Sequence, residues 1–94
     1  MKTQWSVTVR IKCPDYSKGY SANRRIERDD TFQVTCSANP ETAAKIAARR
    51  ALKSERYSVL GLISISARSS DGEIERTFSR RWCEEFYAAS KKMS

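Results

Sequence analysis

The feature that most constrains the fold is a segment in which apolar and polar side chains alternate strictly. The apolar positions are Trp5, Val7, Val9 and Ile11, and a polar residue separates each from the next. A period of two is typical of a β-strand with one buried face and one exposed face. A chain with this pattern must build a sheet and must cover one side of it.

A second alternating segment follows a stretch with the composition of a loop, residues 14–24. Its apolar positions are Phe32, Val34 and Cys36, and the strand is expected to begin near Arg25. Two consecutive aspartates interrupt the pattern within this strand. They are expected to mark either a bulge or the edge of the sheet.

The next segment carries the signals of a helix start. Asn39 is a good N-cap, Pro40 suits the first helical position, and alanine is abundant in the turns that follow. The side chains expected to face a core are Ala43, Ile46, Ala47, Ala51 and Leu52. Because most of them are small, the helix is expected to lie close to the sheet.

Residues 57–67 form the strongest predicted strand, with apolar side chains on both faces. One face is expected to hold Tyr57, Val59, Gly61, Ile63 and Ile65. Leu60 and Leu62 fall on the other face, which favours a central strand or a partner covering that face. A homodimer through Leu60 and Leu62 is one expectation; cover by the loop or by a helix end is the other.

The last part of the sequence predicts a hairpin turn at 69–72, a fourth alternating strand and a second helix. Ser79 is expected to cap this helix, which runs to about Lys92 with Trp82, Phe86 and Ala89 on one stripe. Residues 91–94 are expected to fray. The predicted fold is therefore α+β: a single domain over 1–94, with a four-stranded, largely antiparallel sheet and two helices on one face, in the order ββαββα.

The excess of basic residues predicts a polyanionic partner. Lysine and arginine number 18 against 11 acidic residues, which gives a net charge of +7. Such an excess favours a polyanion, and nucleic acid, either DNA or RNA, or an acidic protein is expected. A membrane partner is not expected, because the alanine face of the first predicted helix is too thin to embed in a membrane surface. Two windows, 16–28 and 45–56, carry the whole excess. The candidate nucleic-acid-binding residues within them are Tyr16, Lys18, Tyr20, Arg24, Arg25, Arg28, Lys45, Arg49, Arg50, Lys53 and Arg56.

These residue types suit a nucleic-acid contact. Cations neutralise phosphates and release counterions, and tyrosine rings such as Tyr16 and Tyr20 stack on bases. Lys45, Arg49 and Lys53 are four residues apart, so they are expected to form a row on one helix face with no acidic residue between them. The alternative for the row is a solvated charged face, and the alternative for the loop is a connection without a function.

A third pair of cations, Arg80 and Arg81, opens the second predicted helix. Two arginines beside the free N–H groups of a helix start are suited to a phosphate. Glu84 and Glu85 follow four residues later, at the spacing of helical ion pairs. Pairing within the helix is the favoured interpretation.

Several classes of function are not expected. Histidine is absent, and the three cysteines show no CxxC spacing, so neither a zinc site nor a cysteine–histidine nucleophile is predicted. No glycine-rich phosphate loop is present, no apolar run is long enough to span a membrane, and no cofactor is expected. We predict reduced, mostly buried cysteines in a cytoplasmic protein that is not an enzyme. The alternative function is a small protein-interaction module, an inhibitor or adaptor that docks on an acidic face of a nucleoprotein or another partner.

Overall fold

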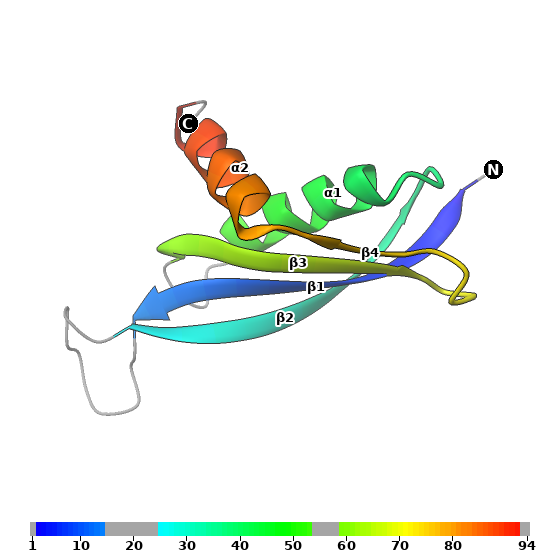
Figure 1. Ribbon diagram of the computed structural model, residues 1–94, viewed down its shortest axis with the longest axis horizontal. Coiled ribbons are helices and arrows are strands. Elements are labelled where there is room, and N and C mark those ends of the chain that lie inside the picture. Colours follow the sequence, from blue (N-terminus) through cyan, green and yellow to red (C-terminus); the bar gives the residue numbers. More distant parts are fainter. Residues whose placement is uncertain (1, 15–24, 54–58, 93–94) are drawn as a thin grey trace.

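The chain folds into one antiparallel sheet with both helices packed on the same face, as predicted (Figure 1). The computed structural model describes residues 2–14, 25–53 and 59–92. The strands lie in the order β2-β1-β3-β4. The elements, in chain order, are β1 (Thr3–Pro14), β2 (Arg25–Cys36), α1 (Pro40–Leu52), β3 (Gly61–Ser69), β4 (Glu75–Phe78) and α2 (Arg80–Lys92). The α+β class and the order ββαββα are confirmed.

The core lies between the helices and one face of the sheet. The side chains that β1 sends into it are Trp5, Val7, Val9, Ile11 and Cys13, each fully buried. The alanines of α1 that face it are Ala43, Ala44, Ala47, Ala48 and Ala51. Because their side chains are short, the α1 backbone lies close to the strands. Two of these alanines were not expected, and the bulkier Ile46 and Leu52 are half-buried at the flank of the helix.

The start of α1 follows the predicted capping pattern. Asn39 has extended backbone angles, and its side-chain oxygen accepts a hydrogen bond from the N–H of Glu41 at 3.0 Å. Pro40 occupies the first helical position, where its missing N–H leaves no intrahelical bond unmade. The cap therefore fixes where the chain leaves β2 and enters the helix.

Replacing Asn39 with alanine is expected to lower the free energy of unfolding by about 1 kcal/mol, because the Glu41 N–H loses its acceptor. The Asn39→Ser variant keeps an acceptor and is expected to stay close to the unmodified protein. Urea unfolding followed by circular dichroism measures both. Equal stabilities for the two variants would show that the cap contributes nothing.

The faces of β3 differ from the prediction. The register between β1 and β3 shifts between Arg10 and Ile11, so β3 carries an extra residue there. Because one extra residue reverses the alternation, Leu62 turns toward the core beside Ile65 and is only 4% exposed. The expectation that Leu62 lies on the face opposite Ile65 was wrong. Leu60 is 38% exposed, so the two leucines do not form one exposed patch. A homodimer remains a prediction, but an apolar patch made of these two leucines no longer supports it.

The other face of the sheet carries short polar side chains and nearly balanced charges. The Thr8 and Thr31 hydroxyls lie 3.2 Å apart, and Arg10 pairs with Asp29 at 2.8 Å. The Arg10 guanidinium lowers the pKa of the Asp29 carboxyl through this hydrogen bond. By register, the charged side chains of this face are Arg10, Lys12, Arg25 and Arg68 against Glu27, Asp29 and Glu75. The basic excess is therefore not concentrated here.

The predictions for the two aspartates, the hairpin turn and the start of the second helix are also confirmed. The two aspartates of β2 lie on an edge strand in unbroken register with β1, so of the two expectations the sheet edge is correct. Gly72 adopts a positive φ of 76° in the turn between β3 and β4. The Ser79 hydroxyl accepts a hydrogen bond from the N–H of Trp82 at 3.2 Å and caps α2, which rises away from the sheet (Figure 1). Neither described helix has the length and apolar character needed to cross a membrane.

Candidate nucleic-acid interface

The arginines at the start of α2 are neutralised within their own helix. Arg80 Nε lies 3.1 Å from Glu84 Oε1, and Arg81 Nε lies 3.3 Å from Glu85 Oε1. Both pairs have the i,i+4 spacing that the sequence analysis favoured, and that interpretation is confirmed. These arginines are well exposed, so each pair contributes little to stability, but each keeps a carboxylate beside its cation.

Two cations of α1 are also engaged. Lys45 Nζ lies 3.4 Å from Glu41 Oε1, so the first member of the row is paired with a carboxylate that precedes the row, a pairing the sequence analysis did not anticipate. Glu41 sits one turn before Lys45, which is the usual spacing for such a pair. Arg50 donates a hydrogen bond to the backbone carbonyl of Gln33 at 3.0 Å. This contact holds α1 against β2, so Arg50 has a structural partner within the domain.

The next two cations of the row, Arg49 and Lys53, are different. Both are exposed, and among the described residues no carboxylate lies within salt-bridge distance of either. The Arg49 guanidinium lies 5.9 Å from the centroid of the Phe86 ring on α2. Lys53 is the C-cap of α1. Cations at a helix C-terminus interact favourably with the helix dipole, by about 0.3–1 kcal/mol each, which explains part of their placement.

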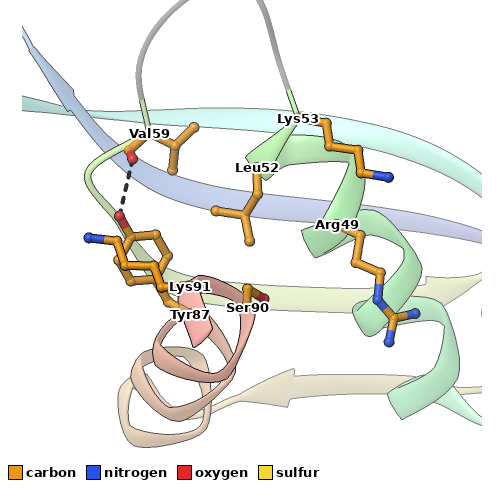
Figure 2. Close-up of a pocket in the computed structure, with 7 residues that line it drawn as sticks. All are labelled: Arg49, Leu52, Lys53, Val59, Tyr87, Ser90 and Lys91. Carbon is orange, nitrogen blue, oxygen red and sulfur yellow. Dashed lines mark hydrogen bonds between the residues drawn. The ribbon is translucent and has the colours of Figure 1, made fainter. Parts of the chain in front are cut away.

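Arg49 and Lys53 border a cleft between the end of α1 and the end of α2. Its volume is about 540 Å³, and it is lined by Arg49, Leu52, Lys53, Val59, Tyr87, Ser90 and Lys91. Figure 2 shows Leu52 pointing toward the middle of the cleft, across from Tyr87. The charged ends of Arg49 and Lys53 lie on the α1 side, and that of Lys91 lies on the α2 side. The cleft thus has apolar walls and a cationic rim.

Hydrogen bonds hold the α2 side of the cleft in place. The Tyr87 hydroxyl donates to the carbonyl of Val59 at 3.3 Å, which links α2 to the segment that enters β3 (Figure 2). The Ser90 hydroxyl donates to the carbonyl of Phe86 at 3.0 Å. The Lys91 ammonium lies 4.8 Å from the centroid of the Tyr87 ring, at cation–π distance. A ligand entering the cleft therefore meets a wall that is already ordered.

The structure brings together only part of the predicted set. Arg49 and Lys53 border the cleft, whereas Arg25 and Arg28 lie on the edge strand β2 and do not line it. The predicted residues that lie outside the described part of the chain are Tyr16, Lys18, Tyr20, Arg24 and Arg56. Lys91 was not predicted, since the sequence analysis assigned residues 91–94 to a frayed end. No local signal identifies it, because only the packing of α2 brings its C-terminal turn toward α1.

The described residues show no cluster suited to nucleophilic or metal chemistry. No three of their Cys, Asp or Glu side chains are placed to share a metal ion. The three cysteines are free, and Cys13 and Cys83 are buried as expected. Burial, with a smaller contribution from Glu84, raises the pKa of Cys83 to about 11, and burial also raises the pKa of Cys36. Both thiols are therefore protonated and unreactive near neutral pH.

Comparison of this chain with protein-family models, with curated proteins and with solved structures finds no match. The fold alone does not assign a function, because one fold supports many activities. The function is therefore inferred from the chemistry of the cleft and its rim.

Proposed function

We propose that this protein binds nucleic acid without catalysing a reaction, and that it holds phosphate groups at the rim of the cleft between α1 and α2. The proposal is carried by one observation. Arg49 and Lys53 are exposed without a carboxylate partner in the described part of the chain, while Lys45, Arg80 and Arg81 each lie against one. Part of the surplus positive charge of the helices therefore lies along this rim, and Lys91 lies on the α2 side of the cleft.

Phosphate is the anion that this arrangement suits. An arginine guanidinium forms paired hydrogen bonds with phosphate oxygens, and a lysine ammonium adds a point charge with three donors. Cations on both sides of one opening favour a chain of anions that passes across it. The net charge of +7 adds long-range attraction and raises the rate of encounter with a polyanion. The tyrosines and cations of the predicted loop, residues 14–24, remain a proposed second contact, which rests on the sequence alone.

The salt dependence of binding tests the proposal. A fluorescent oligonucleotide is titrated with the protein at several salt concentrations, and the dissociation constant is taken from the anisotropy. If rim cations neutralise three phosphates, log K falls with log salt with a slope of about −2 or steeper. The test uses single-stranded and double-stranded DNA and RNA, since the proposal covers each.

Two results would overturn the proposal. One is the absence of binding to every oligonucleotide at about 50 mM salt, where contacts with phosphate are strong. The other is binding that does not change with salt. In either case the alternative, an interaction module that meets carboxylates of an acidic protein, becomes the hypothesis to pursue.

A further inference from the structure

We infer that the cleft between α1 and α2 receives an unpaired base, so that single-stranded nucleic acid is the preferred ligand. This inference rests on the proposed function and adds the class of nucleic acid to it. Contacts with the phosphates of a nucleic-acid backbone need exposed cations but no hollow large enough for a base. Here the cations border a hollow of about 540 Å³, within the range of small-molecule sites.

The walls of the cleft suit a flat, largely apolar group. Leu52 projects from α1, Val59 lies at the entry to β3, and Tyr87 contributes an aromatic ring from α2 (Figure 2). Ser90 adds a hydroxyl to the lining. Nucleic-acid bases stack on aromatic side chains through their faces, and each such stack contributes about 1–3 kcal/mol. Apolar side chains also contact the faces of bases in base-binding pockets. The chemistry of the walls therefore matches a base, and the chemistry of the rim matches the phosphates on either side of it.

The wall formed by Tyr87 is already positioned for such a contact. Its hydroxyl is held by the Val59 carbonyl at 3.3 Å, and the Lys91 ammonium lies 4.8 Å from its ring centroid. Because its hydroxyl is hydrogen-bonded, the ring has already lost part of its side-chain entropy before a ligand arrives.

The cleft discriminates between strand types by geometry. In a duplex each base is stacked between neighbours and its pairing edge is in use, so it enters a pocket only after flipping out of the helix, which costs a few kcal/mol. In a single strand the bases are free to turn outward. A duplex would reach the rim cations with its phosphates but would leave the cleft empty.

The first test uses the unmodified protein and three labelled ligands of about 15 nucleotides, a length that covers one small binding site. The ligands are an oligothymidine strand, an abasic strand with the same phosphates, and a duplex. We expect the abasic strand to bind about 10-fold more weakly than oligothymidine at equal salt slope, because it loses one stacked base. Equal affinities for these two strands, or tighter binding of the duplex, would overturn the inference.

The second test fills the cleft with a larger side chain to show whether the base binds there. The Ser90→Phe variant fills the cleft and leaves its cations in place, whereas Ala88→Phe adds the same ring at an exposed position of α2 outside the cleft. We expect Ser90→Phe to weaken oligothymidine binding about 10-fold with an unchanged salt slope. Ala88→Phe should leave binding unchanged, and thermal unfolding checks that both variants fold.

The outcomes separate this inference from the proposed function. If Ser90→Phe binds oligothymidine as tightly as the unmodified protein, the base is elsewhere, and the salt-dependent binding to phosphate still stands. If the unmodified protein binds none of these three ligands and none of the RNA oligonucleotides of the salt titration, the proposed function itself fails.

Discussion

Replacing Trp5 with alanine is expected to lower the free energy of unfolding by about 3–5 kcal/mol, which is the cost typical of removing a buried tryptophan. The side chain is fully buried at the start of β1, and its indole Nε1 donates to the carbonyl of Ser37 at 3.0 Å. That hydrogen bond connects β1 to the chain between β2 and α1. A domain of this size has a total stability of about 5–15 kcal/mol, so the variant is expected to lose a large fraction of it.

The second tryptophan provides the matched control. Trp82 is half-buried in α2, where its ring lies 4.7 Å from Phe78 and 5.5 Å from Phe86 between centroids. Because less of the Trp82 surface is buried on folding, we expect Trp82→Ala to lower the free energy of unfolding by less than about half of the loss for Trp5→Ala. Urea unfolding of the two variants measures the difference. Equal losses, or a loss below about 1 kcal/mol for Trp5→Ala, would contradict the assignment of Trp5 to the centre of the core.

Most of the fold could be predicted because its signals are local. Alternation in β1 selects the buried face, Asn39 and Ser79 accept hydrogen bonds at the helix starts, and Gly72 supplies the positive φ of the hairpin turn. The position of Leu62 could not be predicted in this way. Its direction depends on a one-residue shift in the pairing of β1 with β3, and alternation within a single strand contains no information on that pairing.

The candidate site could be predicted only in part. Arg49 and Lys53 were found because helical spacing is readable from sequence, and the pairing of Lys45 with Glu41 was equally readable from its i,i+4 spacing but was missed. The contact of Arg50 with β2 and the position of Lys91 depend on how the helices pack on the sheet. Neither feature could be predicted from the sequence of a basic segment, because the sequence of one segment does not show how the helices pack.

Removing the two rim cations of α1 is expected to produce the largest loss of binding. The variant Arg49→Gln with Lys53→Gln keeps polar side chains that favour a helix and lowers the net charge from +7 to +5. We expect a loss of roughly 10- to 30-fold in single-strand affinity at about 0.1 M salt, because two phosphates lose their cations. Both cations interact favourably with the helix dipole at the C-terminus of α1. The variant is therefore also expected to lose about 0.6–2 kcal/mol of its free energy of unfolding, which urea unfolding measures.

The matched control removes the same charge from the start of α2. The variant Arg80→Gln with Arg81→Gln also lowers the net charge from +7 to +5, but these arginines lie against Glu84 and Glu85. At about 0.1 M salt, screening over about 10 Å limits the effect of charges that do not touch the ligand. A loss below about 3-fold is expected, because this variant changes only the general attraction between protein and polyanion.

The most direct measurement of the central claim is the salt slope of oligothymidine binding for the unmodified protein and the two double variants, side by side. The account predicts that the Arg49 and Lys53 variant has a slope shallower by about 1.4, since each neutralised phosphate of a single strand contributes about 0.7. The Arg80 and Arg81 variant should keep the slope of the unmodified protein. Equal slopes for all three proteins, or a shallower slope for the Arg80 and Arg81 variant alone, would contradict the assignment of phosphate binding to this cleft.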